Sequence, residues 1–385
     1  MECIQTNKPS QVKVSRFQTS QGVAEYHLTL QPATDIDFPA QLTELINLYT
    51  TTLRQLQLAE ETAVFCRFFF SDIANQCQYL NPPFPFGKID LLPVALSLVE
   101  QSPPPPIRIA LWAYHIADKN LKKSRQANFL AVYRNSLTHY WLTNFTAKGN
   151  SSYQQTWRIF QKCARQMKKR GMNLADSLIR TWLFVRDIDT NYFGLVKARR
   201  KFFATCGLTP ETHFVASSGI GGAGKDLKSL VTLDAYAISG LRQEQISYLS
   251  APDYLSPTYL YGVTFERGTV IAYQDRKQVI ISGTASIDSA GQVLYPGEVE
   301  KQLNRTLENI SALLTVAGAS MKDVVCFITY VRDPADQKKI ALAMDSLFPG
   351  VPLMVLVAPV CRPAWLVEVE ALATVPAYFP EFPVF

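Results

Sequence analysis

The order of apolar and polar residues divides the first half of the chain into strands and helices. Residues 37–57 carry apolar side chains at helical spacing and predict an amphipathic helix. Residues 152–172 predict a second helix, with Ser151 or Ser152 as its N-cap and Gly171 at its C-terminal end. A third helix is expected at 190–207. Dense apolar runs, or alternation with period two, predict strands within 1–35 and at 62–73, 109–117, 139–145 and 177–189.

The second half repeats this order of elements. Strands are expected at 269–273, 278–283, 324–333, 352–360 and 364–375, and helices at 297–317 and 333–348. Each half therefore reads strand–strand–helix–strand–helix–strand, which favours helices packed on a mixed sheet. The Gly-rich segment 217–224 predicts a turn, and it lacks the Gly-Lys-Ser/Thr of a phosphate-binding loop. Similarity between 156–160 and 306–310, and between RTWLFVRD and ITYVRD, indicates an internal duplication.

Composition excludes several classes of protein. The 385 residues are 48% hydrophobic and 18% charged, which is typical of a globular chain, and the formal charge of +6 is spread out. No basic and aromatic stripe predicts a nucleic-acid partner. No apolar run approaches ~20 residues, and the N-terminus lacks a signal-peptide layout, so we expect no membrane span. The seven cysteines are scattered without a C-x-x-C pair, which predicts a reducing, cytoplasmic location and neither disulfides nor a metal site.

The segment PVCRPAWLVEVEALA (359–373) is the strongest candidate for chemistry. Period two along its strand places Trp365 and two valines on one face, and Leu366, Glu368 and Glu370 on the other. A carboxyl held against apolar surface has a raised pKa and can act as a general acid near neutral pH. On the residues alone, a solvated face with ordinary surface charge is the favoured interpretation.

Residues 270–375 resemble the YjgF/RidA (UK114) family. The resemblance is carried by VIISGTASID, Gln302 and Asn309, Ala317-Gly318, VVCFITYVRD, Pro352 and LVEVEALA. It implies a chorismate-mutase-like α+β unit, of the kind that forms trimers with ligand clefts between subunits.

A closer resemblance, to the chorismatases, covers residues 135–385. It is carried by RTWLFVRDID, Tyr192 with ARRKFF, SSGIGG, YGVTFERG, SGTASI and CRPAWLVEVE. These enzymes split pyruvate from chorismate and are built of two RidA-like domains. The resemblance therefore implies an α+β fold with a divergent N-terminal domain at 1–230 and a C-terminal RidA/YjgF-like domain at 240–385.

The same resemblance implies roles for particular residues. Glu368 matches the catalytic acid, and Cys361 matches the branch that makes 3-hydroxybenzoate, as does the small residue Gly268. The carboxylate-binding positions of the family match Arg186, Arg199 and Arg267. No metal or organic cofactor is implied.

The chemistry of chorismate agrees with such a set, although each residue has a structural alternative. Chorismate carries two carboxylates, which arginine matches bidentately, and an enol ether that needs a proton delivered to carbon. Glu368 could instead pair with Arg362, and the arginines could be surface charge. Cys361 beside Arg362 has either a lowered thiol pKa or, as we favour, a neutral pocket-lining role. Tyr248 is a candidate partner for a ring hydroxyl, with packing as its alternative.

Three functions follow from these residues. The first is a chorismatase-like enzyme that releases pyruvate, with 3-hydroxybenzoate as the expected aromatic product. The second is a RidA-type imine or enamine deaminase, with Arg362 as the carboxylate-binding residue. The third is a non-catalytic small-molecule-binding member of the fold. The expected assembly is a monomer with a pseudo-trimeric core or a homotrimer.

Overall fold

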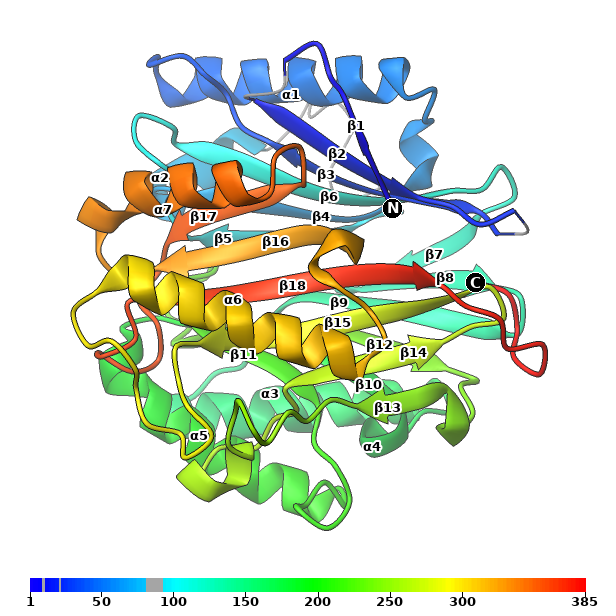
Figure 1. The fold of residues 1–385 in the computed structure, drawn as a ribbon, viewed down its shortest axis with the longest axis vertical. Coiled ribbons are helices and arrows are strands. Elements are labelled where there is room, and N and C mark those ends of the chain that lie inside the picture. The colour runs from blue at the N-terminus through cyan, green and yellow to red at the C-terminus, as the bar shows by residue number, and fades with distance from the viewer. Residues whose placement is uncertain (9–10, 21, 81–92) are drawn as a thin grey trace.

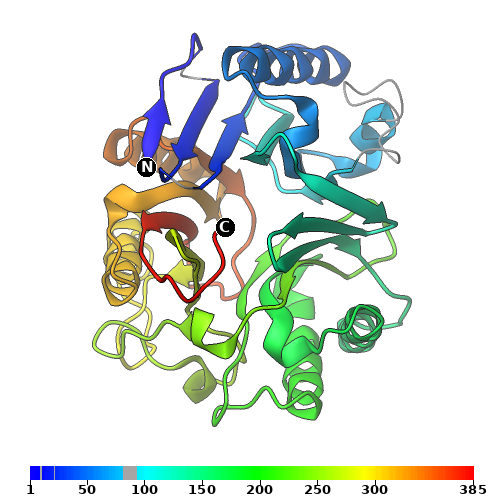
Figure 2. The same cartoon turned by 90° about the vertical axis from the view of Figure 1, so that its right-hand side faces the viewer.

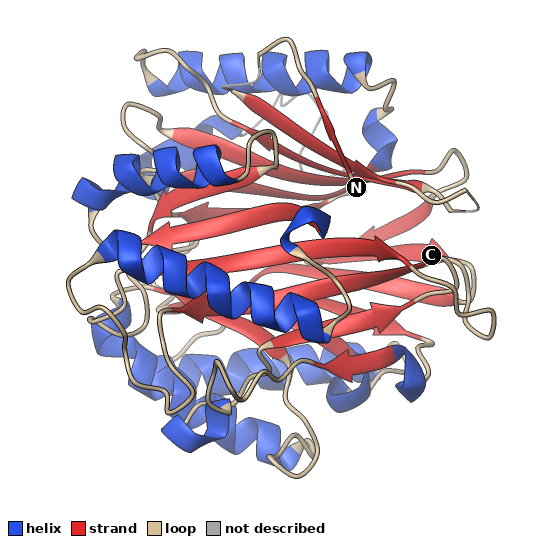
Figure 3. Cartoon of the chain, in the orientation of Figure 1, coloured by secondary structure: helices blue, strands red, loops and turns tan. Residues whose placement is uncertain are grey.

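Three six-stranded sheets form the framework of the chain (Figures 1 and 3). They are seen in a computed structural model that describes residues 1–8, 11–20, 22–80 and 93–385. Figure 2 shows the three sheets arranged around one interior with the helices on the outside. We call each sheet with its helices a unit, numbered in chain order.

The first unit spans residues 2–117. Its strands, in sheet order, are β1 (Glu2–Ile4), β2 (Val12–Phe17), β3 (Ala24–Leu30), β6 (Ile109–Ala117), β4 (Ala63–Phe70) and β5 (Ala95–Glu100). Its helices are α1 (Phe38–Gln55) and the single turn α2 (Ile73–Gln76). The predicted helix at 37–57 is confirmed as α1, which begins at the cap Asp37, whose side chain accepts from the Ala40 N–H.

The second and third units repeat this order. The second sheet runs β7 (Lys122–Gln126), β8 (Phe129–Arg134), β9 (Leu137–Phe145), β12 (Val231–Ser239), β10 (Leu178–Val185) and β11 (Ala216–Gly221). Its helices are α3 (Ser152–Lys168), α4 (Leu174–Ser177) and α5 (Ile188–Thr205). The third sheet runs β13 (Ile246–Tyr248), β14 (Gly268–Ala272), β15 (Arg276–Ala285), β18 (Val367–Pro376), β16 (Val324–Val331) and β17 (Leu353–Val357), with helices α6 (Val299–Val316) and α7 (Pro334–Leu347).

In every unit the last strand in sequence lies at the centre of the sheet, and a parallel pair closes one edge. The parallel pairs are β4–β5, β10–β11 and β16–β17. The predicted duplication is confirmed, because residues 156–160 lie in α3 and residues 306–310 in α6, which occupy equivalent places.

The core sits where the three sheets face one another. One continuous apolar cluster contains Trp112 of β6, Trp182 of β10 and Tyr330 of β16, each almost fully buried. Because this cluster draws on all three sheets, the interior of each unit is completed by the other two.

One local expectation differs from the structure, and the predicted division into two domains stays a prediction. Residues 1–230, predicted as one divergent domain, hold the first sheet and all of the second except β12. After β4 the described residues hold the single turn α2, where the 18-residue α5 follows β10 and the 14-residue α7 follows β16. Residues 217–224 were predicted as a turn, and residues 216–221 instead form β11. The α+β class with repeated units is confirmed.

None of the helices in the described ranges is long and apolar enough to cross a membrane.

Candidate active site

A cavity lies between the second and third units, with about 470 Å³ of space when its open mouth is included. The second unit supplies α5 and β11 to its walls. The third unit supplies the segment before β14, the strands β15 and β18, and the loop before β18. The residues that matter for its chemistry are Tyr192, Arg199, Ser217, Ser218, Tyr261, Arg267, Gly283, Cys361, Arg362, Trp365 and Glu368.

Small residues in β11 allow the two units to approach closely. The Gly221 N–H donates to the carbonyl of Pro359 at 2.8 Å, and Ile220 forms an isolated antiparallel bridge with Val360. A Cβ on Gly221 would lie 2.7 Å from Pro359 Cδ, so a larger residue there would push the units apart. The edge of the second sheet is thereby fixed against the loop that carries Cys361.

Glu368 points into this cavity from β18 and is only 4% exposed. Burial raises its pKa to about 8, with a further raising effect from the charge of Glu370 and opposing effects from Arg180 and Arg267. Among the described residues, its side chain has no hydrogen-bond partner. The solvated face favoured from the residues alone is therefore wrong, because the second unit covers this side of the strand.

Glu370 shares the face of Glu368 but has a different environment. Its carboxylate accepts hydrogen bonds from Trp182 Nε1 at 2.8 Å and Tyr330 Oη at 3.1 Å, and it forms a 3.1 Å ion pair with Arg180. The carboxylate of Glu370 is therefore paired by three donors from two other strands of the described structure. The two acids that look alike in the sequence are thus one paired group and one group without a partner.

Two buried arginines face Glu368 from opposite units. Arg199, 1% exposed, donates from Nη1 to Ser217 Oγ at 3.1 Å, and its Nε and Nη2 have no acceptor among the described residues. Arg267, 5% exposed, donates from Nη2 to the Ser256 carbonyl at 2.8 Å, and its Nε is likewise without an acceptor. Buried donors without partners are costly in an empty protein, so these groups favour an anionic ligand in the cavity.

Arg362 adds a third cation at the same cavity. Its guanidinium lies over the rings of Tyr261 and Trp365, 5.1 and 5.3 Å from their centroids. Its predicted alternative role as an ion-pair partner of Glu368 is not seen, because no ion pair between the two is present in the described structure.

Cys361 is a neutral thiol in this environment. Burial raises the pKa of the thiol to about 12, and the neighbouring Glu368 carboxyl adds to that effect. The alternative of a lowered thiol pKa is therefore wrong, because the shift caused by Arg362 is smaller than the cost of burial. Burial also raises the pKa of the adjacent Tyr192, which keeps that phenol protonated.

The structure brings together Glu368, Cys361, Arg199 and Arg267 and leaves the other predicted residues outside the cavity wall. Arg186 follows β10, and its Nε is 3.4 Å from the Ser229 carbonyl. Tyr248 stacks on His213 with ring centroids 4.3 Å apart. Gly268 packs under strand β15, where a Cβ would lie 2.9 Å from the Ile280 carbonyl.

Sequence reasoning missed the residues that support Glu368 from behind. Ser218 Oγ accepts from Arg180 Nη2 at 2.6 Å and from the Gly283 N–H at 2.8 Å. The signal was present in the motifs SSGIGG and SGTASI, but nothing in the sequence shows that these segments meet.

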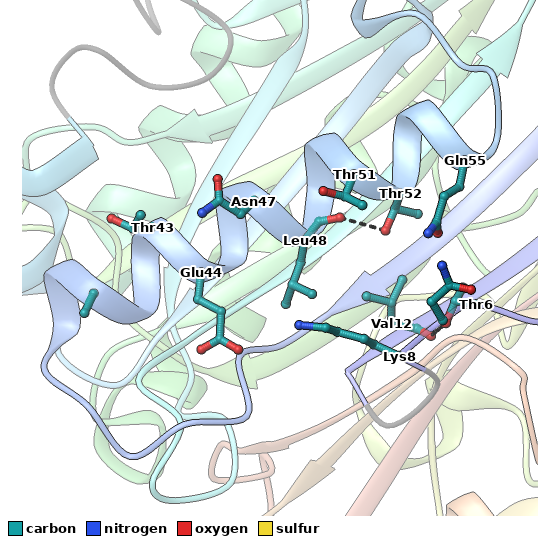
Figure 4. A pocket seen from close by; sticks show the side chains of 12 residues that line it. Thr6, Lys8, Val12, Thr43, Glu44, Asn47, Leu48, Thr51, Thr52 and Gln55 are labelled. Atoms are coloured by element: carbon teal, nitrogen blue, oxygen red, sulfur yellow. Dashed lines mark hydrogen bonds between the residues drawn. The ribbon is translucent and has the colours of Figure 1, made fainter.

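A second groove in the described residues does not combine an unpaired acid with buried arginines. The groove in Figure 4 lies between α1 and the N-terminal strands and is lined mainly by Thr, Asn and Gln side chains. Its one carboxylate, Glu44, is already hydrogen-bonded to Gln11 and Thr34. Among the described residues no cluster of His, Cys, Asp or Glu could hold a metal ion.

Some known proteins are similar to the third unit of this chain, and one solved structure is similar to most of the fold. The family model described as Endoribonuclease L-PSP matches residues 269–375. A RutC family protein of Pyrococcus abyssi is 33% identical over 97 residues, which cover 25% of this chain and 76% of that protein. A RutC family protein of Pyrococcus horikoshii is 32% identical over 97 residues, with 25% and 77% covered. A solved chorismatase structure matches with a TM-score of 0.64 at 18% identity, covering 82% of this chain and 94% of that chain, which shows a shared fold.

Proposed function

The chain belongs to the RutC family, and from its cavity we propose that it is a chorismatase-like enzyme that releases pyruvate from chorismate. One observation carries the proposal. A buried carboxylic acid whose pKa is raised to about 8 lies in the same cavity as three arginines. That combination suits a substrate with negative charges and a site that must be protonated at carbon.

Glu368 is the proposed general acid. Its proton goes to the methylene carbon of the enolpyruvyl ether, and the ether carbon becomes an oxocarbenium ion. Water adds to this carbon, and the resulting hemiketal breaks its bond to the ring oxygen, which releases pyruvate and a ring diol. Because the acid remains protonated up to about pH 8, it can deliver the proton at neutral pH.

Arg199 and Arg267 are the proposed carboxylate clamps. Each has at least one buried nitrogen without an acceptor, and they reach the cavity from opposite walls. Two separated clamps match the two carboxylates of chorismate better than a single carboxylate. Arg186, Tyr248 and Gly268 stay candidates from the family resemblance only, since none of them lines the cavity.

The proposed aromatic product is 3-hydroxybenzoate. Loss of one water from the ring diol gives this product, so chorismate is converted without net gain or loss of atoms into 3-hydroxybenzoate and pyruvate. A neutral thiol at Cys361, beside Tyr192 and Glu368, lines the part of the cavity where the ring would be held.

The test is a coupled pyruvate assay with chorismate, followed by chromatography of the aromatic products. Wild type is expected to release pyruvate and 3-hydroxybenzoate, and Glu368→Gln is expected to lose pyruvate release by about 100-fold or more. Unchanged release in that variant would remove Glu368 from the reaction. Pyruvate with a ring diol or 4-hydroxybenzoate would keep the reaction class and overturn the product assignment.

All walls of the cavity come from one chain, so we propose that activity needs no homotrimer. Light scattering should give a mass near 43.2 kDa for the active species, with specific activity independent of concentration. Activity confined to a trimeric fraction would contradict this.

The second candidate function is hydrolysis of imines, and Arg362 is the observation that favours it. This arginine lines the cavity six residues before Glu368 and could hold the carboxylate of a 2-imino acid. The test is the decay of an imine generated in situ by an amino-acid oxidase. Accelerated decay in wild type but not in Arg362→Met, without pyruvate release from chorismate, would favour this function over the first.

A further inference from the structure

The second acid of the terminal strand, Glu370, lies on the same face as the proposed catalytic acid, two residues away. It is only 5% exposed, and its three donors come from Trp182, Tyr330 and Arg180. Nothing in the proposed reaction uses it, because it does not line the cavity. A buried anion this close to Glu368 must nevertheless act on it through the electric field.

Arg180 connects this anion to the catalytic carboxyl. Arg180 is fully buried in β10, pairs with Glu370, and donates from Nη2 to Ser218 Oγ at 2.6 Å. Ser218 also accepts from the Gly283 N–H at 2.8 Å. Ser218 thus contacts both Arg180 and Gly283, and Gly283 in turn lies against the Glu368 carboxyl.

The charges around Glu368 come from every element packed against it. The second unit contributes Arg180 from β10, and Arg199 with Tyr192 from α5. The third unit contributes Arg267 before β14 and Cys361 with Arg362 in the loop. Several arginines thus lie around one acid, and their positive charges favour loss of its proton, against the effect of burial. Glu370 is the anion that opposes them.

We propose that the Glu370–Arg180 pair is a positioning element that keeps the proton on Glu368 by placing a fixed negative charge beside it and neutralising the nearest arginine. The inference rests on the proposed function, in which Glu368 must be protonated to act. It assigns no direct contact with substrate to either member of the pair.

The test follows the basic limb of the pH–rate profile, the pH above which the acid loses its proton and activity falls. In Glu370→Gln the charge of Arg180 is no longer neutralised, so the limb should move down by about 1–3 pH units. In the double variant Arg180→Gln/Glu370→Gln both charges are gone, and the limb should return toward the wild-type position. If Glu370→Gln does not fold, Arg180→Gln replaces it and the limb should move up.

The chain offers a matched control in the second unit. Asp234 occupies the position in β12 that Glu370 occupies in β18. In the second sheet Asp234 pairs with Trp182 of β10, and in the third sheet Glu370 pairs with Ile328 at the equivalent position of β16. It forms a 2.9 Å ion pair with the buried Arg67, and Ser97 donates to it. Asp234→Asn therefore disrupts an equivalent buried pair away from Glu368, and it should leave the basic limb unchanged.

A readout without substrate separates this inference from the proposed function. The infrared difference spectrum between each background and the same protein with Glu368→Gln isolates the carboxyl band of this side chain. Titration should show the protonated band persisting to a lower pH in Glu370→Gln than in wild type. An unshifted band and limb in Glu370→Gln, or an equal shift in Asp234→Asn, would overturn the inference. Absence of pyruvate release with the expected shift of the band would overturn only the proposed function.

Discussion

The substitution Gly283→Ala is expected to separate the stability of this protein from its activity. Gly283 lies in β15 directly against the carboxyl of Glu368, the proposed general acid. A Cβ at this position would lie 1.9 Å from Glu368 Oε1, 2.8 Å from its Cδ and 2.9 Å from Ser218 Oγ. The backbone at Gly283 is not among those with a positive φ, so alanine fits the strand and only the neighbouring side chains must respond.

The size of the effect follows from these distances. Ordinary contact begins near 3.4 Å, so the carboxyl oxygen must retreat by about 1.5 Å. Misplacing a reacting group by about 1 Å costs roughly 100-fold in rate, so kcat should fall by at least about 100-fold. The stability cost is confined to the contact with Ser218 Oγ, because Glu368 has no hydrogen bond to lose and alanine gains about 0.5–1 kcal/mol over glycine within a strand.

The assay combines pyruvate release with thermal unfolding. Gly240→Ala is the control, because this glycine has φ +88° and its Cβ would lie 2.8 Å from the Ser136 carbonyl, outside the cavity wall. That variant should lose stability and keep its activity per folded molecule, the opposite of Gly283→Ala. If Gly283→Ala keeps kcat within about threefold of wild type, the position of Glu368 is not what limits the reaction.

Three further predictions use the same buried groups. Glu368 has a pKa of about 8 in the folded state and about 4.3 in the unfolded state. Between these pH values the folded state binds more protons, so the free energy of unfolding falls as pH rises. Glu368→Gln should lack this decline when urea unfolding is followed from pH 5 to 8. Arg199→Lys should raise KM by about 10–100-fold and change kcat less, because lysine cannot replace the planar fork, and steady-state kinetics will show whether kcat falls instead. Asp234→Asn and Glu370→Gln should each lower the free energy of unfolding by about 3–5 kcal/mol by leaving a buried arginine unpaired, and equal midpoints and slopes in urea would contradict this.

Local patterns predicted most of the elements that position the site. Helices α1, α3, α5, α6 and α7 all lie where apolar spacing places them, because an amphipathic stripe is a local property of the chain. The alternation that put Glu368 and Glu370 on one face of the terminal strand is also local, and it holds in β18.

The sequence does not show which element of another unit packs against each face of a strand. Trp182 is 188 residues from Glu370, and Ser218 is 65 residues from Gly283, yet these contacts belong to the surroundings that pair Glu370 and leave Glu368 without a hydrogen bond. Burial of Glu368 comes from the second unit, so no pattern within its own strand could predict it. The same holds for Arg186 and Tyr248, whose side chains point to partners outside the cavity.

In the described residues, the three units differ at the position that Glu368 occupies in the third unit. The strand pairings place Glu368 of β18, Thr232 of β12 and Ala110 of β6 at equivalent positions, opposite Tyr330, Phe184 and Phe69. Of these three equivalent positions, only that of the third unit carries a carboxyl, which belongs to the proposed general acid. By contrast, an acid at the Glu370 position recurs as Asp234, where its ion pair with Arg67 serves the core.

The first and second units are joined by a side chain at the position equivalent to Gly283. Asn144 of β9 is equivalent to Gly283 of β15. The residue after Asn144, Phe145, pairs with Leu233 of β12, and the residue after Gly283, Thr284, pairs with Val369 at the equivalent position of β18. The Asn144 amide donates to the Leu96 carbonyl at 2.6 Å and its Oδ1 accepts from the Leu98 N–H at 3.0 Å. Asn144 therefore joins the two sheets at the position where the cavity of Glu368 has Gly283, and the absence of a side chain on Gly283 leaves room for the Glu368 carboxyl.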